Sequence, residues 1–485
     1  MRVFFKIYVI VFYIFFSCND DLFKKFSSRP NILWLVAEDQ SPEFFPMYGN
    51  KTISLPNLEQ LTKDGIIYTN AYAPVPVCAP SRSALITGMY PSTIGTHNMR
   101  TYNAYKKFNE PSINIPSYSP IVPEGVRMFT EYLRKQGYYC TNNSKEDYNF
   151  KPLPNAWDES SRKAHWKNRP KGTPFFSVFN FGITHESQIW KQKNEPLLVD
   201  PEKLIVPPIF PDNDIIRKDL AVNYSNLIRL DVQVGSILNE LKSAGLYDNT
   251  LIFFYSDHGG PFPRHKRALY ETGIKVPLII KMPHNKNAQN QEERFVSFID
   301  YAPTLLSFIG IDPPEIMQGK AFLGKHKTPN PSFIFATSDR YDEKIDKLRA
   351  VRYGNYKYIR NFNPTISNAI DVSYREQMPM MKNMRELWES NKLSKNIAQW
   401  FSTPKPEEEL YDISNDPYEL KNLAKNRELI DTLFLLRNKL DQWIKETGDM
   451  GVLSEKEILK SFFPEGKPPK LLPLSYKIEN DLIIL

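Results

Sequence analysis

The stretch "NILWLVAEDQSP", residues 31–42, contains the pattern that decides the fold. Ile32 to Val36 is an unbroken apolar run, and two acids, Glu38 and Asp39, follow it almost at once. A strand that is apolar at every position is buried on both faces, which is typical of parallel sheets covered by helices. The stretch therefore predicts a central strand whose carboxyl end carries acidic side chains.

Three further stretches repeat this pattern of a buried strand: "PFFSVFNFGITHES" (174–187), "TLIFFYSDHGG" (250–260) and "VPLIIKMP" (276–283). Segments with apolar residues at helical spacing, such as 223–249, lie between the strands. This alternation predicts an α/β domain over residues 30–325, with a mostly parallel sheet sandwiched by helices. In open sheets of this class, ligands bind at the carboxyl ends of the strands.

The character of the chain changes after this domain. Shorter strands with tight turns, as in "LRAVRYGNYKYIRNF" (348–362), are followed by a helical pattern over 426–447. We therefore predict a smaller C-terminal subdomain over 326–485, built on a short antiparallel sheet. The 485 residues and 41% hydrophobic composition are sufficient for two to three domains.

Residues 1–18 resemble a secretory signal peptide. Arg2 and Lys6 precede an apolar run, Ile7–Phe16, which is too short to span a bilayer. Ser17 and Cys18 follow, as at a bacterial lipoprotein cleavage site, and simple secretion is the alternative. We expect an exported protein, in the periplasm or anchored to the outer membrane by lipid on Cys18 alone.

Charge and motifs give no support for a nucleic-acid partner. The net charge is +7, and removal of the signal peptide lowers it by two because two basic residues leave with it. No arginine-rich arm, zinc-finger spacing or helix-turn-helix pattern is present in the sequence. Such a small surplus of positive charge suits a polyanionic partner only weakly.

The chain has only three cysteines, and their contexts differ. Cys18 would carry the lipid, and Cys140 follows a helix-then-strand pattern that predicts a small core residue. Cys78 begins the stretch "CAPSRSALITG", which predicts a helix, and Arg82 lies one helical turn further on. Cys78 is therefore predicted not to be structural, although exported proteins usually pair their cysteines.

Four polar residues after two buried strands form a candidate metal site. They are Glu38 and Asp39 after the first strand, and Asp257 and His258 after the strand at 250–256. Carboxylate oxygens suit a hard divalent ion such as calcium or magnesium, while the single imidazole leaves manganese or zinc open. The alternative is that each acid merely caps a helix or a turn.

Three cations, Lys145, His185 and Lys266, lie in loops after strand-like segments, and Arg82 adds a fourth, one helical turn past Cys78. A metal ion and several cations in one pocket would bind a tetrahedral oxyanion. Each cation taken alone would more often be a solvated surface side chain.

These residues carry a family resemblance. "CAPSRSALITG" (78–88) resembles the sulfatase signature, C-x-P-x-R with a closing Thr-Gly, and "NILWLVAEDQSP", "LIFFYSDHGG" and "KRALYETGIKVPLII" (266–280) resemble the strands around the sulfatase site. The resemblance extends through most of the chain after Pro30. It implies the fold of the alkaline-phosphatase superfamily. "GTHNMR" and "NNSKEDYNF" are similar to bacterial polysaccharide sulfatases of the sulfamidase- and heparan-sulfatase-like branch.

The resemblance also implies a chemistry for Cys78. In formylglycine-dependent (type I) sulfatases, a formylglycine-generating or anaerobic maturation enzyme oxidises this cysteine to an aldehyde, which hydrates to a diol. One diol oxygen attacks sulfur, and the second hydroxyl later expels sulfate and restores the aldehyde. Arg82 would offset negative charge, and Lys145, His185 and Lys266 would grip sulfate and protonate the leaving oxygen.

The resemblance further implies one calcium ion, held by Glu38, Asp39, Asp257 and His258. The chain departs from the family pattern at some positions. The family usually has aspartate at 38, often asparagine at 258, and commonly histidine where Asp147 stands. We expect His97 to replace that histidine as the second base; the alternative is that His97 caps a turn or lines the substrate pocket.

The predicted function is hydrolysis of sulfate esters, with N-sulfate as a variant, on a sulfated polysaccharide or oligosaccharide. A phosphatase or phosphonate monoester hydrolase of the same superfamily is one alternative, because an Asp-His pair after a strand fits those enzymes too. A lipoprotein that binds sulfated glycan without turnover is the other. The predicted partners are the glycan substrate and the maturation enzyme.

Overall fold

The computed structural model describes residues 29–101, 115, 117–152, 154–286, 288–464, 477–479 and 482–484. The predicted signal peptide with Cys18 lies outside the described residues. Within them, no helix is both long enough and apolar enough to cross a membrane.

A central sheet of eight strands confirms the predicted α/β fold. Its order is β4-β3-β5-β1-β6-β7-β2-β8, and every neighbouring pair is parallel except the two pairs that involve β7. The strands are β1 (Asn31–Ala37), β2 (Ile66–Tyr72), β3 (Tyr139–Asn143), β4 (Glu159–Ser160), β5 (Phe175–Phe181), β6 (Thr250–Ser256), β7 (Lys275–Lys281) and β8 (Asn290–Ser297). β1 is buried at all of its residues, as its apolar run predicts.

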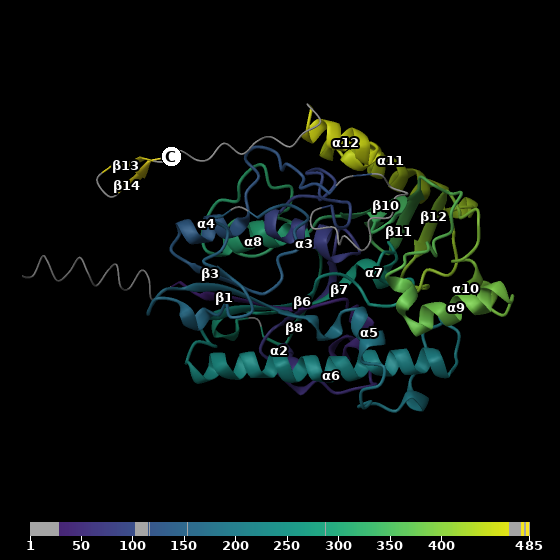
Figure 1. Cartoon of the computed structure of the whole chain (residues 1–485), viewed down its shortest axis with the longest axis horizontal. Coiled ribbons are helices and arrows are strands. Elements are labelled where there is room, and N and C mark those ends of the chain that lie inside the picture. The colour runs from purple at the N-terminus through teal and green to yellow at the C-terminus, as the bar shows by residue number, and fades with distance from the viewer. Residues whose placement is uncertain are drawn as a thin grey trace, which may run out of the picture.

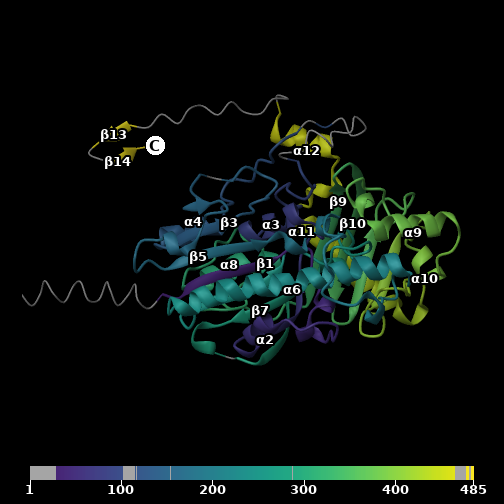
Figure 2. The same cartoon turned by 60° about the horizontal axis from the view of Figure 1, so that its bottom comes forward.

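Helices cover both faces of this sheet (Figure 1; Figure 2). α2 (Pro56–Lys63) and the long α6 (Asp214–Ser243) lie on one face. α3 (Cys78–Thr87), α4 (Phe129–Lys135) and α8 (Tyr301–Phe308) lie on the other. Two large clusters of buried apolar side chains fill the two layers. Both faces of the sheet are therefore covered by apolar side chains, and polar residues that could bind a ligand are expected only at its edges.

Short elements connect these parts. α5 (Ser187–Lys191) and α7 (Glu271–Ile274) lie near the carboxyl edge of the sheet. The 3-10 turns are Pro42–Phe44, Pro46–Tyr48, Trp166–Asn168, Gly182–Thr184, Pro201–Lys203, Pro283–Asn285, Phe298–Asp300, Arg375–Gln377, Arg427–Leu429 and Met450–Val452.

A four-stranded antiparallel sheet forms the C-terminal part, as predicted. Its order is β12-β11-β10-β9, and α11 packs against it. The elements are β9 (Phe333–Tyr341), β10 (Lys344–Tyr353), β11 (Tyr356–Asn361), α9 (Pro379–Glu389), α10 (Lys395–Ala398), β12 (Glu408–Asp412), α11 (Ile430–Thr447) and α12 (Glu455–Phe462), followed by a hairpin of β13 (Lys477–Glu479) and β14 (Leu482–Ile484). The division of the chain at residues 325 and 326 stays a prediction.

The two sheets meet near the start of α3. The backbone N–H of Met99 donates to the carbonyl of Arg340, near the end of β9, at 2.8 Å. Tyr341 packs in one apolar cluster with Met99 and Cys78. The small sheet therefore supports the edge of the large sheet at which the predicted site residues lie.

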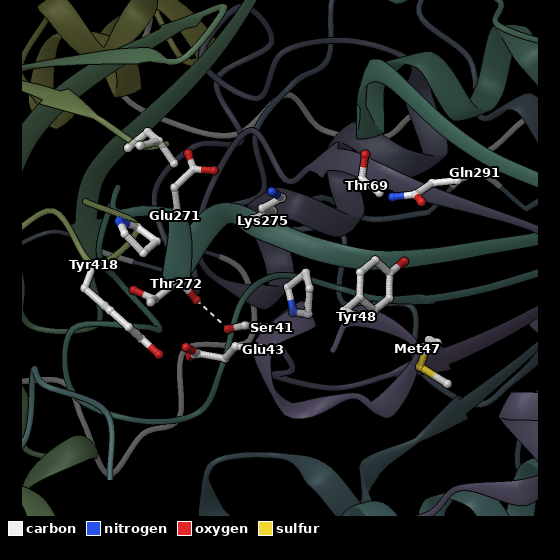
Figure 3. Close-up of a pocket in the computed structure, with 13 residues that line it drawn as sticks. Ser41, Glu43, Met47, Tyr48, Thr69, Glu271, Thr272, Lys275, Gln291 and Tyr418 are labelled. Carbon is white, nitrogen blue, oxygen red and sulfur yellow. Dashed lines mark hydrogen bonds between the residues drawn. The ribbon is translucent and has the colours of Figure 1, made fainter. Parts of the chain in front are cut away.

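One cavity of about 480 Å³ lies between the loop after β1 and the segment of α7 and the start of β7 (Figure 3). Glu43, Tyr48, Lys275 and Tyr418 are among the residues that line it. Ser41, on its wall, donates through Oγ to the carbonyl of Thr272 at 2.7 Å. None of the predicted site residues lines this cavity, so it is separate from the site described below.

Candidate active site

The carboxyl ends of β1, β5 and β6 meet at one edge of the central sheet. Ala37, at the end of β1, is in register with Phe181 of β5 and Ser256 of β6. The loops that follow these three strands therefore begin side by side at the same edge of the sheet. The backbone N–H of Asp39 donates to Asp257 Oδ1 at 3.1 Å, which joins the two acidic loops directly.

Cys78 is the first residue of α3, and its side chain is fully buried at this edge. Its Sγ lies 3.4 Å from His258 Nε2, 3.5 Å from Lys266 Nζ and 3.9 Å from Asp39 Oδ1. Burial would raise the pKa of the Cys78 thiol, but Lys145 and Lys266 outweigh that effect and lower the pKa to about 6. A negatively charged nucleophile at this position is therefore stabilised at neutral pH.

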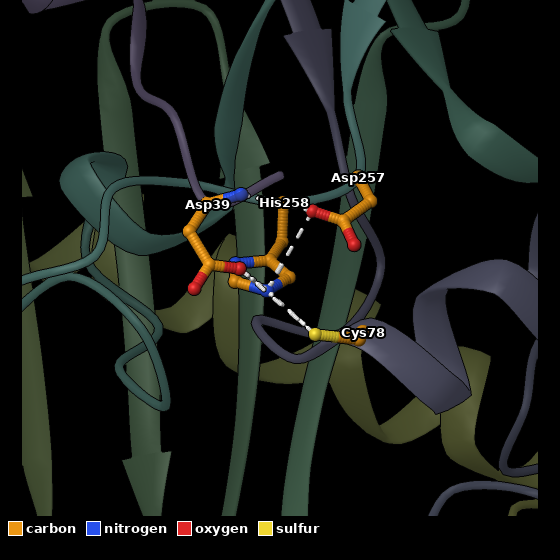
Figure 4. A group of neighbouring side chains, drawn as sticks. All are labelled: Asp39, Cys78, Asp257 and His258. Atoms are coloured by element: carbon orange, nitrogen blue, oxygen red, sulfur yellow. Dashed lines mark hydrogen bonds and ion pairs between the residues drawn. The ribbon is translucent and has the colours of Figure 1, made fainter. Parts of the chain in front are cut away.

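The Cys78 sulfur faces Asp39, His258 and Asp257, which lie beside one another (Figure 4). One donor atom from each of these four residues lies within 4.8 Å of the others. His258 Nε2 is 2.9 Å from Asp39 Oδ1 and 3.8 Å from Asp257 Oδ1. Burial raises the pKa of the Asp257 carboxyl, but Arg82 and other cations outweigh it and lower the pKa to about 2.

Glu38 is placed differently from the other predicted metal ligands. Its Oε2 lies 3.1 Å from Lys145 Nζ, and its Oε1 lies 3.7 Å from Arg82 Nη2. It is not among the residues whose donor atoms gather around Cys78. In this geometry Glu38 neutralises two cations at the side of the site.

Arg82 lies one turn along α3 from Cys78, as the spacing predicts. Its Nε and Nη2 donate to Asp257 Oδ2 at 3.2 and 2.9 Å, and its Nη1 donates to Asn180 Oδ1 at 2.6 Å. Because all three guanidinium nitrogens have a partner, the orientation of the planar group is fixed. Arg82 therefore holds the Asp257 carboxylate and places a fixed positive charge beside Cys78.

Lys266 and His185 lie together on another side of the sulfur. Lys266 Nζ donates to Asp39 Oδ2 at 2.8 Å, and it is 3.1 Å from Glu186 Oε1 and 3.4 Å from His185 Nε2. His185 Nδ1 lies 2.9 Å from Ser187 Oγ. The Ser187 contact fixes the ring, so that Nε2 faces the lysine and the site.

Among the described residues, no hydrogen bond or ion pair joins His97 to Cys78 or to the other predicted site residues. His97 is buried, and its Nδ1 has no hydrogen-bond partner within the described ranges. It lies near Asp449, where burial raises the pKa of the carboxyl but Arg349, with His97 contributing less, holds it below its usual range. His97 lines neither the cavity of about 480 Å³ nor the larger cavity, of about 940 Å³, that opens beside Lys145 and His185.

Cys140 is buried in the core, as predicted, and both it and Cys78 are free thiols. Burial raises the pKa of the Cys140 thiol well above its usual range. The two cysteines therefore sit in opposite environments, one inert and one surrounded by cations.

Comparison with known sequences assigns the family. The sequence model of the family described as Sulfatase matches residues 30–163 and 138–311, which together cover more than half of the chain. The chain belongs to the sulfatase family. It is therefore a sulfuric ester hydrolase by family. A second model, of the C-terminal part of N-sulphoglucosamine sulphohydrolase, matches residues 260–403.

This sulfatase is similar in sequence to two named proteins and in fold to a third. An ulvan-active sulfatase of Formosa agariphila is 43% identical over 90% of this chain and 78% of its own. The human N-sulphoglucosamine sulphohydrolase is 26% identical over 94% and 96% of the two chains. A protein solved in complex with its substrate D-glucosamine-2-N,6-O-disulfate has a TM-score of 0.62 and 18% identity, over 87% and 98% of the chains, which shows a shared fold.

The sequence reading of this sulfatase missed two buried ionic residues. Glu186 accepts from Arg267 Nη1 and Nη2 at 2.8 and 2.9 Å, and its backbone N–H donates to Asp39 Oδ2 at 2.7 Å. Each follows a predicted site residue directly, Glu186 after His185 and Arg267 after Lys266. That adjacency was the available signal.

A cavity of about 940 Å³ opens beside the sulfatase site. Glu38, Lys145 and His185 line it, so the side of the site that faces Lys145 and His185 is reached from this space. Tyr374 also lines it, and its ring lies 6.3 Å from that of His185. A cavity of this size is at the upper end of the range for pockets that enclose a whole organic ligand.

The donor set fits a divalent metal ion, which sulfatases of this family generally use together with formylglycine. Asp39 and Asp257 are fully buried, and Lys266 and Arg82 each pair with one of them, at 2.8 and 2.9 Å. Burial lowers the pKa of His258, but those two carboxylates outweigh it and raise the pKa to about 10. Even with those two ion pairs in place, the carboxylates favour a further positive charge at the point where the three side chains converge.

Proposed function

We propose that this sulfatase hydrolyses sulfate groups of a sulfated polysaccharide or oligosaccharide, with Cys78 converted to formylglycine as the nucleophile. The observation that carries the proposal is the position of Cys78. Its Sγ is fully buried at the start of α3, within 4 Å of His258, Lys266 and Asp39. A maturation enzyme would supply the oxidant that turns the thiol carbon into the aldehyde, whose hydrate provides both the attacking oxygen and the hydroxyl that later expels sulfate.

A calcium ion is the proposed metal, held by Asp39, Asp257 and His258 with Glu38 at the side. When bound, it would polarise a sulfate oxygen and stabilise the ionised nucleophile. His258 would then bind as neutral imidazole, since a metal ligand must give up its proton. Glu38 must leave Lys145 or Arg82 if it binds the ion directly.

Other side chains of the site are proposed to bind the sulfate and to protonate the leaving group. Arg82 and Lys145 place fixed positive charges where the sulfate oxygens would lie, and Lys266 neutralises Asp39 while facing residue 78. His185, with Nε2 directed at the site, is the proposed acid that protonates the leaving oxygen, and Lys266, whose Nζ lies 3.4 Å from that Nε2, is proposed to assist on the same leaving side. We assign no step to His97, because no described contact links it to Cys78.

The substrate class follows from the relatives and from the cavity. The relative at 43% identity is active on ulvan, which makes an ulvan-type polysaccharide our first proposal. The human relative at 26% identity makes an N-sulfated glucosamine the second. A cavity of about 940 Å³ is far larger than one sulfate needs, which supports a substrate with several sugar units.

Export is part of the proposal, with the mature chain starting at Cys18 and held to the membrane by lipid. This places the enzyme where polysaccharide fragments from outside the cell would reach it. The motivation is the sequence Ile7–Phe16 followed by Ser17 and Cys18.

Desulfation of a defined panel tests the function. The matured enzyme is incubated with ulvan oligosaccharides, N-sulfated and O-sulfated heparan-type disaccharides and nitrophenyl sulfate, and released sulfate is measured by chromatography. A paired nitrophenyl phosphate assay addresses the phosphatase alternative. Turnover of a sulfated glycan that is absent with Cys78→Ala supports the proposal. Phosphate turnover that exceeds sulfate turnover, or binding without any turnover, would reject it.

A further inference from the structure

Two cations on the wall of the site cavity are not engaged in any contact described above. Arg162 and Lys191 both line the cavity of about 940 Å³, and both side chains are exposed. In the part of the chain that the structure describes, neither side chain has a hydrogen-bond or ion-pair partner. Both are therefore available to a ligand that enters the cavity.

The chain places each of these cations beside a proposed catalytic residue. The carbonyl of Arg162 accepts from Asn143 Nδ2 at 3.1 Å, and Asn143 ends β3 just before Lys145. Lys191 ends α5, the helix that begins two residues after His185. Arg162, Lys191, Lys145 and His185 all line the same cavity, so a substrate whose sulfate lies at Lys145 and His185 shares that space with both cations.

The other cations of the cavity are already compensated. Lys145 is paired with Glu38 at 3.1 Å, and Arg100 lies 3.8 Å from both Asp147 and Asp342. Arg162 and Lys191 therefore add positive charge that no carboxylate of the described cavity wall balances through an ion pair. Glu146, which accepts from Ser160 Oγ and has no ion pair with any described residue, also lines the cavity and offsets part of this charge, so that the wall keeps a small positive surplus. A surplus of one sign in a cleft concentrates counter-charged ligands there.

We propose that Arg162 and Lys191 bind further anionic groups of the substrate, carboxylates or sulfates other than the sulfate that is removed. The inference rests on the proposed function and narrows its substrate to polyanionic glycan. Arg162 would bind such a group through two parallel hydrogen bonds, and Lys191 as a point charge. The two residues thus determine specificity and take no part in the chemical step.

Exposed cations are often merely solvated, so the experiment uses neighbours of the same kind as controls. Lys163 follows Arg162 directly, and Lys193 lies two residues after Lys191. Both are exposed and neither lines the cavity. A double variant at these positions removes the same charge from the same surface without touching the cavity wall.

The test compares Arg162→Gln/Lys191→Gln with Lys163→Gln/Lys193→Gln, both as matured full-length enzyme. The substrates are a sulfated disaccharide with a neighbouring carboxylate, its carboxyl-reduced analogue, and a disulfated analogue without the carboxylate. We expect the cavity variant to lose about tenfold in kcat/KM, mostly through KM, on a doubly anionic substrate relative to the reduced analogue. The two doubly anionic arms show whether carboxylate or sulfate is the group that is bound.

Equal losses for the two double variants would overturn the inference, because they would indicate general attraction by surface charge. Equal losses on the doubly anionic and the reduced substrate would overturn it as well. If the unmodified enzyme releases sulfate from none of these substrates, nor from nitrophenyl sulfate, the proposed function fails and the inference fails with it.

Discussion

Replacement of Glu186 by glutamine tests the buried ionic support of the site. Glu186 is buried and accepts both Nη groups of Arg267 at 2.8 and 2.9 Å, while Lys266 Nζ lies at 3.1 Å. The glutamine oxygen can keep one of these hydrogen bonds. Arg267 and Lys266 would nevertheless lose the negative charge that compensates their burial.

Two lines of reasoning give similar magnitudes for Glu186→Gln. Removal of one partner from a buried ion pair typically costs about 3–5 kcal/mol of unfolding free energy. Burial raises the pKa of Glu186, but Arg267 and Lys266 outweigh it and lower the pKa from 4.5 to about 2. That difference corresponds to about 3 kcal/mol of stability from ionised Glu186 at neutral pH. We therefore expect a loss of about 3 kcal/mol.

The pH dependence has a defined sign. The pKa of Glu186 is lower in the folded than in the unfolded chain, so its contribution is present above about pH 4.5 and is lost as the pH falls towards about 2. Urea unfolding from pH 7 down to pH 3 should therefore show the gap between wild type and variant narrowing below pH 4.5. Glu195→Gln, an exposed neighbour on the same segment, should change stability by less than about 0.5 kcal/mol. A loss under about 1 kcal/mol for Glu186→Gln at pH 7 would show that the charge of Glu186 does not stabilise the buried Arg267 and Lys266.

Three further predictions concern the site and the anchor. Chelation should abolish turnover and calcium restore it, and Asp257→Ala should lose both bound metal and activity; a fully active enzyme that contains no metal would contradict this. His185→Ala and Lys266→Ala should lose far more activity on sugar sulfates than on nitrophenyl sulfate, because an activated phenol leaves without protonation; equal losses would indicate sulfate binding instead. Cys18→Ala should move the protein from the membrane to the soluble periplasmic fraction, and unchanged fractionation would rule out the anchor.

Much of the fold follows from local sequence pattern. Apolar runs such as Ile32–Val36 can only be buried on both faces, and helical segments between them predict a layered sheet. The direction of β7 did not follow, because "VPLIIKMP" is equally apolar in a parallel or an antiparallel strand. The chain from β6 passes over the carboxyl edge at residues 257–270 and enters β7 from that edge, which makes β7 antiparallel to β6.

The site residues that directly follow a buried strand could be predicted from the sequence. Asp39 and Asp257 each come directly after a buried strand, so the sheet itself brings them together. Glu186 and Arg267 were missed because their pairing depends on two loops that are 81 residues apart. The position of His97 could not be predicted in this way. It is near the motif in sequence, but that nearness does not determine which way a loop turns its side chains.

The proposed reaction depends on residue 78 being a formylglycine. The most direct measurement is mass spectrometry of the tryptic peptide with residue 78, on protein made with and without a maturation system, with sulfate release measured on the same samples. We predict an aldehyde at position 78, reactive towards hydrazides, in a fraction that rises in proportion to activity, while Cys78→Ala folds, keeps its metal and turns over nothing. A fully active preparation in which position 78 is an unmodified thiol, or full activity in Cys78→Ala, would contradict the account.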